Sequence, residues 1–320
     1  MSVLVYTESD QGKFKKVAFE VASYAKAIAD QFGTSTTAVA INAKDASQLG
    51  KYGVDKVLNV SNSNLDAFKA NSYADVIKQA AEKEGSKIIV LSSSINSKYL
   101  SSILAINLNA GLASNVIALP VNTTPFVIKR TAFTNKAFEH CQINTDIKIV
   151  ALSSNSFGLI ENPTSPNIED FSPNITDSGI TVKSIDQATD KVTIADAEIV
   201  VSAGRGLKGP ENWGMIEELA DVLGAATACS KPVSDLGWRP HSEHVGQTGK
   251  PVACGLYIAI GISGAIQHLA GVSASKVKVV INTDPEAPFF KAADYGIIGD
   301  AFEVVPALIE KLKEFKLQNA

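Results

Sequence analysis

The sequence is poor in cysteine and in charged residues, and it has no long basic or acidic run. Its three cysteines, Cys141, Cys229 and Cys254, lie far apart without a Cys-x-x-Cys pair, which excludes a disulfide framework and a cysteine zinc site. Charged residues make up 19% of the chain, below the usual share of about 25%, which favours a permanent protein partner. The formal net charge of -4 offers nucleic acid no attraction. We therefore expect a protein of the reducing cytoplasm that binds no nucleic acid.

Signals for export, membrane insertion and hydrolysis are also missing. Met1 leads directly into a strand-like run, which leaves no room for a basic and then apolar leader. The most apolar stretch, residues 252–272, is interrupted by glycines, which suits a buried strand followed by a helix better than a membrane span. His241 and His244 follow a proline and precede a glycine turn, so we interpret them as a solvated loop rather than a metal site. There is no Gly-x-Ser-x-Gly elbow for a hydrolase.

Apolar runs alternate with helical patterns in the first half of the chain. Strand-like runs cover 3–6, 37–41, 56–60 and 87–91, and helical patterns cover 14–28, 73–84 and 97–110. Apolar runs bounded by helices are typical of parallel strands buried on both faces. The runs 126–128 and 146–151 are predicted as strands of an antiparallel appendage, and the Ser-, Asn- and Pro-rich stretch 153–179 as a surface crossing.

A second α/β unit begins near residue 197. Its strand signals are 197–203, 225–229, 256–260, 277–281 and 295–298, with helical patterns at 213–223, where Gly224 suits the C-cap, and at 301–315. The pattern predicts an α/β protein of two domains. We expect residues 1–190 to form an N-terminal α/β domain that resembles nucleotide-binding domains and makes the contacts with a partner subunit. Residues 191–320 are expected to form a C-terminal Rossmann-like domain with a parallel sheet.

The loop 204–209 fits the pattern G-x-G-x-x-G between a predicted strand and a predicted helix. Glycines in this context let the backbone approach a pyrophosphate. The next strand, however, ends in Ser230 and Lys231, where a nicotinamide site usually places an acid for the ribose. NAD is therefore disfavoured, whereas a dinucleotide held by other contacts and a purely structural loop both remain open.

Two further loops could meet a heteroaromatic ring. Gln247 and Thr248 present an amide and a hydroxyl on a glycine-hinged loop, although a plain turn is equally compatible with the spacing. This loop is no Walker A motif, because Pro251 follows its lysine. In the segment 261–268, Ser263 is the expected N-cap of a short helix. His268 lies about one turn into it, where it could stabilise negative charge on a reduced ring or be purely structural.

At this point the ordered motifs closely resemble the α subunit of electron transfer flavoprotein. They are the segments 202–207, 245–250, 256–259, 261–271, 282–288 and 293–297, with a looser match at 108–112 and 130–137. The resemblance implies an αβ heterodimer with one FAD, held mainly by the C-terminal domain of α, and AMP in the β subunit. It implies an electron carrier rather than an enzyme with its own turnover. Flavin dehydrogenases, typically acyl-CoA dehydrogenases of fatty acid β-oxidation, would donate electrons, and a membrane quinone oxidoreductase would accept them without membrane insertion of this chain.

The resemblance also implies a set of FAD-binding residues. They are Arg205, Ser230, Lys231, Val245, Gly246, Gln247, Thr248, Ser263, Gly264, Ala265, Ile266, Gln267, His268, Asn282, Asp300 and Ala301. Ser230 would lie near the pyrophosphate, Thr248 near flavin N5 and His268 near the C2 carbonyl. Segment 263–267 would cover the middle of the cofactor, and the last three residues would meet the adenosine end. No catalytic and no metal-binding residue is implied.

Two departures from the family pattern stand out. Lys231 occupies a position where many members carry an Arg beside the flavin, and an ammonium cannot reproduce a planar guanidinium. The stretch 253–255 lacks the usual Pro, and its Cys254 fits a buried thiol better than a cofactor contact. Three other hypotheses remain. They are an NAD(P)-dependent enzyme built on the glycine motif, an NADH-using, electron-bifurcating relative with a second flavin in β, and a nucleotide sensor without redox work.

Overall fold

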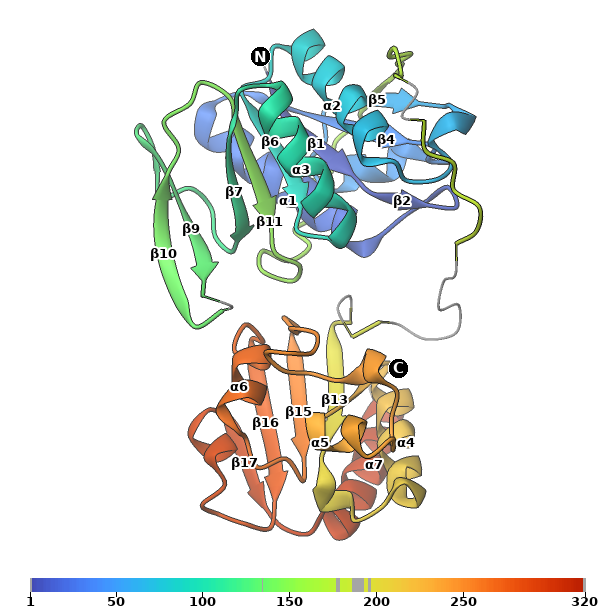
Figure 1. Ribbon diagram of the computed structural model, residues 1–320, viewed down its shortest axis with the longest axis vertical. Coiled ribbons are helices and arrows are strands. Elements are labelled where there is room, and N and C mark those ends of the chain that lie inside the picture. Colours follow the sequence, from blue (N-terminus) through green and yellow to red (C-terminus); the bar gives the residue numbers. More distant parts are fainter. Residues whose placement is uncertain (1, 134, 177–178, 186–192, 195–196, 319–320) are drawn as a thin grey trace. The chain divides into compact units, whose positions relative to one another are not determined.

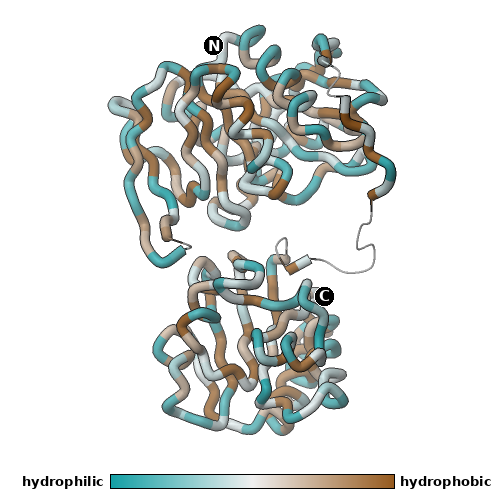
Figure 2. The backbone as a smooth tube through the Cα atoms, in the orientation of Figure 1, coloured by the Kyte–Doolittle hydropathy of each residue, from teal (hydrophilic) through white to brown (hydrophobic). Residues whose placement is uncertain are grey.

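The computed structural model describes residues 2–133, 135–176, 179–185, 193–194 and 197–318. The chain forms two compact units (Figure 1). The N-terminal unit comprises Met1–Ala132 and Phe138–Gln187, and the C-terminal unit comprises Phe133–Ala137 and Ala188–Ala320. Each unit is an α/β layer structure, and hydrophobic residues gather along the strands of both sheets (Figure 2).

The N-terminal unit is built on one large mixed sheet. Its strands are β1 (Ser2–Thr7), β4 (Ser35–Ile41), β5 (Lys56–Val60), β6 (Ile88–Ser92), β7 (Gly111–Val116), β8 (Asn122–Thr123), β9 (Phe126–Ala132), β10 (Ala137–Gln142), β11 (Lys148–Leu152) and β12 (Asn167–Asp170). The order is β10-β9-β7-β11-β6-β1-β4-β5-β12, with β8 paired to β9. Helix α1 (Lys16–Phe32) packs on one face, and helices α2 (Ala70–Glu84) and α3 (Ile95–Asn107) pack on the other. The short hairpin β2 (Ser9–Asp10) and β3 (Lys13–Phe14) and the 3-10 helices η1 (Ala46–Lys51) and η2 (Ser63–Leu65) complete the described elements.

The structure corrects the sequence prediction in two places. Strand β11, predicted in the antiparallel appendage, lies inside the sheet and pairs parallel with both β6 and β7. Its run Ile149 to Leu152 is fully buried, as an interior parallel strand requires. The stretch predicted as a surface crossing contains β12, which pairs parallel with β5 at the sheet edge. Strand β9 is antiparallel to β7, as predicted for the appendage.

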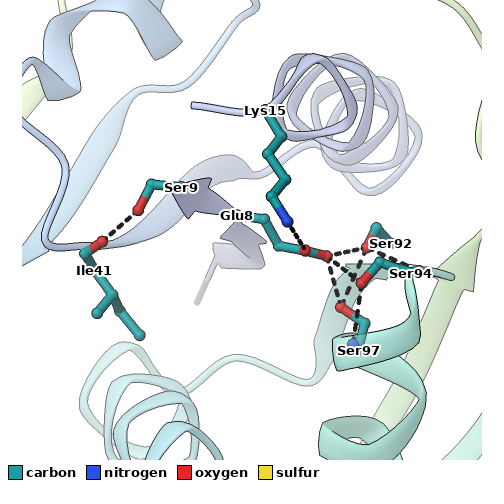
Figure 3. A network of polar contacts seen from close by, with 7 residues as sticks. All are labelled: Glu8, Ser9, Lys15, Ile41, Ser92, Ser94 and Ser97. Atoms are coloured by element: carbon teal, nitrogen blue, oxygen red, sulfur yellow. Dashed lines mark hydrogen bonds and ion pairs between the residues drawn. The ribbon is translucent and has the colours of Figure 1, made fainter. Parts of the chain in front are cut away.

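A buried carboxylate joins the carboxyl ends of β1 and β6 (Figure 3). Glu8 follows β1, and its Oε1 accepts hydrogen bonds from the hydroxyls of Ser92, Ser94 (2.6 Å) and Ser97 (2.9 Å). Lys15 Nζ lies 3.8 Å from the other carboxylate oxygen. Because buried charge is costly unless it is paired and hydrogen-bonded, these donors let one side chain connect two strands and α3.

The C-terminal unit contains an all-parallel sheet, as predicted. Strands β13 (Ile199–Ala203), β14 (Ala226–Cys229), β15 (Leu256–Ile260), β16 (Val277–Asn282) and β17 (Tyr295–Ile298) have the order β14-β13-β15-β16-β17. Helices α4 (Gly214–Leu223) and α7 (Ala301–Gln318) cover one face, while α6 (Ile266–Val272) lies on the other. The remaining elements are α5 (Lys231–Asp235), η3 (Arg205–Leu207), η4 (Pro210–Trp213), η5 (His241–Glu243) and η6 (Pro288–Lys291).

Several local predictions in this unit are confirmed. Gly224 ends α4 with φ 66°, and its N–H bonds the carbonyls of Ala220 and Asp221. The apolar stretch 252–272 contains β15 and then α6, and none of the helices described is long and apolar enough to cross a membrane. Strand β14 lies on one side of β13, and the next strand in the sequence, β15, lies on the other side of β13. The sheet therefore has a topological switch point between β13 and β15, where ligands bind in open α/β sheets.

Candidate functional site

A cavity of about 510 Å³ lies at the carboxyl ends of the C-terminal strands, around the switch point. Loops after β13, β14, β15 and β16 supply its wall. The lining residues are Arg205, Ser230, Lys231, Pro232, His244, Val245, Gly246, Gln247, Thr248, Gly261, Ile262, Ser263, Ala265, Gln267, His268, Asn282 and Asp284. Loops that are distant in sequence thus meet because parallel strands end at the same edge of the sheet.

The glycines of the 204–209 loop serve a contact within the protein. A Cβ on Gly204 would lie 2.3 Å from the carbonyl oxygen of Gly261, and one on Gly206 would lie 2.6 Å from the Gly261 Cα. The N–H of Gly206 donates to the Gly261 carbonyl at 3.2 Å. The sequence left open whether these glycines approach a pyrophosphate or have only a structural role. In the structure they let the loops after β13 and β15 touch, and only Arg205 of this motif lines the cavity.

The loop after β15 differs from its prediction. Helix α6 begins at Ile266 with Ala265 as N-cap and without a side-chain cap bond, so the prediction of Ser263 as N-cap is wrong. Gly264 has φ +88°, and a Cβ there would meet the Phe289 backbone nitrogen at 2.5 Å. The chain therefore makes an additional turn against Phe289, whose N–H donates to the Ser263 carbonyl. This turn leaves Ser263 in the cavity wall.

Two buried histidines stand in the wall. The Nε2 atom of His268 shares a 2.9 Å hydrogen bond with the Tyr257 hydroxyl, and the backbone of Val245 is a further hydrogen-bond partner of the imidazole. His244 is 1% exposed, its Nδ1 has no hydrogen-bond partner in the described protein, and so the expectation of a solvated loop is wrong for this residue. Gly246 separates the two residues: a Cβ on it would lie 3.5 Å from His244 Nε2 and 3.7 Å from the His268 Cα.

Burial keeps both imidazoles neutral at physiological pH. Burial, with a smaller effect of the neighbouring His244, lowers the pKa of His268 to about 4, against the opposite effect of a backbone hydrogen bond with Val245. Burial is also the main cause of the lowered pKa of His244, with His241 and Lys231 adding to it. The positive charge in the cavity wall therefore comes from Lys231 and Arg205 rather than from the histidines.

A separate ion-pair cluster holds the segment that carries His244. Arg239 bonds both carboxylate oxygens of Glu243 at 2.8 and 2.6 Å and reaches Glu217 on α4 at 3.0 Å. Its guanidinium also stacks on Trp213, 5.3 Å from the ring. Bidentate pairs of this kind add geometric specificity. Arg239 thus fixes η5 against α4 and sets where the next residue, His244, enters the wall.

Most residues implied by the resemblance line the cavity, but four do not. Gly264 and Ile266 lie within the lining loop without facing the cavity, and Asp300 and Ala301 lie at the start of α7. Asp300 accepts a hydrogen bond from the Phe302 N–H at 3.0 Å and pairs with Lys208 at 3.6 Å, which gives it a structural role at the helix start. Cys254 is buried, and its Sγ contacts the Leu256 carbonyl rather than the cavity.

Sequence analysis missed several lining residues, namely Pro232, His244, Gly261, Ile262 and Asp284. Asp284 follows β16, which ends at the predicted residue Asn282, and it lies at the same sheet edge as the loops that were recognised, so strand order would have pointed to it. Asn282 also donates from Nδ2 to the Ile262 carbonyl at 3.1 Å, which ties the loops after β15 and β16 together. Among the described residues there is no cluster of His, Cys, Asp and Glu that could hold a metal ion.

The lining suits a nucleotide-type cofactor. Arg205 and Lys231 supply positive charge, and Ser230, Ser263 and Thr248 supply hydroxyls. Positive charge and hydroxyl donors suit the phosphate oxygens of a nucleotide. The fold and the cavity therefore define a two-domain α/β protein with a candidate cofactor site at the switch point of its C-terminal sheet.

Comparison with known proteins identifies the family. Residues 3–176 match the electron transfer flavoprotein domain, and residues 193–273 match the electron transfer flavoprotein FAD-binding domain. The chain is 38% identical to the electron transfer flavoprotein subunit alpha of Bacillus subtilis, with 99% of both chains covered. It is 36% identical to the subunit alpha of Thermoanaerobacterium thermosaccharolyticum and 32% identical to Protein FixB of Clostridium saccharobutylicum, with at least 96% of each chain covered. The protein belongs to the electron transfer flavoprotein α-subunit family.

Membership in this family carries two conclusions. The C-terminal unit contains the family's FAD-binding domain, which supports FAD as the cofactor of this chain. The chain is one subunit of a heterodimer with a β subunit. The expectations of an electron transfer flavoprotein subunit and of FAD binding are thus confirmed at this level.

Proposed function

We propose that this chain is the FAD-holding subunit of an electron shuttle, with one FAD per αβ heterodimer and AMP in the β subunit. Flavin dehydrogenases, acyl-CoA dehydrogenases in particular, deliver electrons to it, and a membrane quinone oxidoreductase receives them. The observation that carries the proposal is the switch-point cavity, whose cations and hydroxyls suit the phosphates and polar groups of a flavin dinucleotide. The protein acts in the cytoplasm and carries electrons without turning over a substrate of its own.

The proposed roles of individual residues come from the family resemblance and are supported by their position in the cavity wall. Arg205 and Ser230 hold the pyrophosphate, where a cation and a hydroxyl neutralise and bond phosphate oxygens. Thr248 and His268 offer hydrogen bonds at the ring, and Asn282 contacts the adenosine end. The proposed contacts of Gly264, Ile266, Asp300 and Ala301 rest on the family resemblance alone.

FAD, when bound, supplies the electron-accepting and electron-donating chemistry. The chain contributes binding, orientation and electrostatics. The neutral His268 can take part in hydrogen bonds but supplies no charge. Lys231, which is exposed at the rim, is the cation that remains on the ring side.

The first test is the visible absorption spectrum of the chain purified after co-expression with a β-type subunit. Flavin bands at one FAD per heterodimer are expected, and Arg205→Ala should lower the FAD content. Lys208→Ala is the matched control, because Lys208 lies on the same loop but outside the cavity wall. A colourless complex that takes up no added FAD would refute the proposal and favour the nucleotide-sensor hypothesis.

The choice between a simple shuttle and an NADH-using bifurcating protein needs a second experiment. For the proposed shuttle, the flavin absorption should stay unchanged when the FAD-loaded complex is mixed with NADH under anaerobic conditions. The flavin absorption should be bleached by an acyl-CoA dehydrogenase together with its substrate. Rapid bleaching by NADH would establish the bifurcating alternative instead.

A further inference from the structure

One part of the cavity wall begins directly after the ion-pair cluster of Arg239. Glu243 belongs to this cluster, and the five residues that follow it, 244–248, all line the cavity. We call these five residues the wall segment. A single peptide bond connects Glu243 to the wall segment, so the place of the Glu243 side chain sets where the wall segment starts.

The turn before the wall segment, η5, forms local hydrogen bonds with its own backbone. The N–H groups of Glu243 and His244 donate to the carbonyls three residues before them, at 3.0 and 3.2 Å. The side chains of Ser234 and His241 share a longer contact of 3.4 Å, which joins η5 to the adjacent helix α5. These bonds shape the turn but do not reach α4. The Arg239 side chain supplies the connection between η5 and α4.

Arg239 joins three groups through one guanidinium. It bonds both carboxylate oxygens of Glu243 and one oxygen of Glu217 on α4, and it lies over the Trp213 ring. The side chains of Arg239 and Glu243 are 17% and 14% exposed, so water and salt screen this pair less than a surface pair. A lysine carries the same charge but lacks the planar fork of donors. The cluster therefore depends on the shape of the guanidinium as well as on its charge.

Loss of the guanidinium leaves two carboxylates without their shared partner. Glu217 and Glu243 both lie within hydrogen-bond distance of Arg239, so their like charges would then face each other without compensation. Glu243 is the less exposed of the two, at 14% against 41%, and therefore gains more by moving into water. Because the wall segment follows Glu243 directly, it loses its fixed starting point.

We propose that Arg239 is a positioning residue for the wall segment. The guanidinium holds residues 244–248 in place before a cofactor enters the cavity, and this preorganisation slows the release of the bound molecule. The inference rests on the proposed FAD site for the identity of that molecule, whereas the order of the wall segment is a property of the chain itself.

The first test is amide hydrogen exchange of the full chain in complex with a β-type subunit, prepared without flavin. The N–H groups of Val245 and Gln247 donate to the carbonyls of Cys229 at 3.0 Å and Gln267 at 2.8 Å, so their exchange reports on the wall segment. In Arg239→Leu, exchange of these two amides should become about tenfold faster. The core strands β13 and β15 should keep their protection.

The matched control removes another ion pair of the same helix. Lys313 pairs with Glu218 of α4 at 2.7 Å, both side chains are 53% exposed, and neither lines the cavity. Exchange of the wall segment in Lys313→Ala should equal that of the unsubstituted protein.

The second readout is the rate at which the loaded complex releases FAD. Release should be about tenfold faster in Arg239→Leu than in the unsubstituted protein and unchanged in Lys313→Ala. Arg239→Lys should release FAD almost as fast as Arg239→Leu, because the ammonium keeps the charge but cannot bond both carboxylates in the same geometry.

The outcomes separate this inference from the proposed function. Unchanged exchange of the wall segment in Arg239→Leu overturns the inference even if FAD is bound. Equal acceleration in β13 and β15 also overturns it, because stability rather than position would then be lost. Slow FAD release fully restored by Arg239→Lys would show that charge alone suffices, and so overturns it as well.

Two further cases remain decisive. If the complex binds no FAD, the proposed function fails, while exchange without flavin still decides the role of Arg239. If Arg239→Leu does not fold, Glu217→Ala takes its place, since this variant removes only the carboxylate on α4. Faster exchange confined to the wall segment then supports the inference, and unchanged exchange overturns it.

Discussion

Acidification should destabilise the C-terminal unit through His268. Burial lowers the pKa of this imidazole from the ordinary 6.5 to about 4. Between these values the unfolded chain binds a proton that the folded unit excludes. The stabilisation is therefore complete above about pH 6.5 and is lost as the pH falls toward 4.

The size of the effect follows from the shift. The full difference between the two pKa values corresponds to about 3 kcal/mol in the free energy of unfolding. On a single-site linkage basis, about 2 kcal/mol of this is lost between pH 7 and pH 5. The lowered pKa of His244 contributes in the same direction. Most carboxylates titrate below this window, so the loss there reports on the two histidines.

Tryptophan fluorescence makes the measurement specific. Both tryptophans, Trp213 and Trp238, belong to the core of the C-terminal unit, so denaturant unfolding followed by their emission reports on that unit. The full chain is unfolded at a series of pH values without added flavin. In His268→Gln, the loss of unfolding free energy between pH 7 and 5 should shrink to the part that His244 contributes. His140 is exposed and lies in the other unit, so His140→Gln should show the same pH dependence as the unsubstituted chain. An unchanged pH dependence in His268→Gln would refute the reasoning.

Three further predictions concern other contacts. Gly206→Ala places a Cβ 2.6 Å from the Gly261 Cα. This overpacking should destabilise the contact between the two loops by about 1–3 kcal/mol and so lower the FAD content of the purified protein. An undiminished flavin absorption spectrum would contradict this prediction. Glu8→Gln removes the carboxylate charge that three serine hydroxyls and Lys15 surround. The free energy of unfolding of the N-terminal unit should fall by about 1–3 kcal/mol. Far-ultraviolet circular dichroism should detect this loss, while the unfolding transition followed by tryptophan fluorescence stays unchanged. Hydrogen bonds from lysines lower the pKa of Glu169 to about 2, so this stabilisation of β12 is present above about pH 4.5 and is lost toward pH 2; hydrogen exchange of β12 should accelerate across that range, and constant protection would exclude the ion pairs.

Local patterns were sufficient for most of the elements. Apolar runs bounded by helices predicted the core parallel strands, because a strand buried on both faces needs apolar side chains at every position. Gly224 was predictable as a C-cap because the left-handed conformation favours glycine. The family motifs located most of the cavity wall, since several of them are short segments at the carboxyl ends of strands.

Errors arose where a distant segment decides the structure. Strand β11 looks like an appendage strand in the sequence, but its place is set by β6 and β7 on either side. Ser263 is a residue type that commonly caps helices. Its carbonyl, however, accepts a hydrogen bond from the Phe289 N–H, the loop makes another turn, and the helix begins only at Ile266.

The histidines show the same limit in chemistry. The sequence determined which segments form strands and helices, and which loops follow the strands of the C-terminal sheet. Only the tertiary structure decided that Gly206 faces Gly261 rather than a ligand, that His244 is buried, and that Tyr257 bonds His268. Periodicity depends on neighbours along the chain, whereas desolvation and hydrogen bonding depend on neighbours in space, which the chain supplies from far apart.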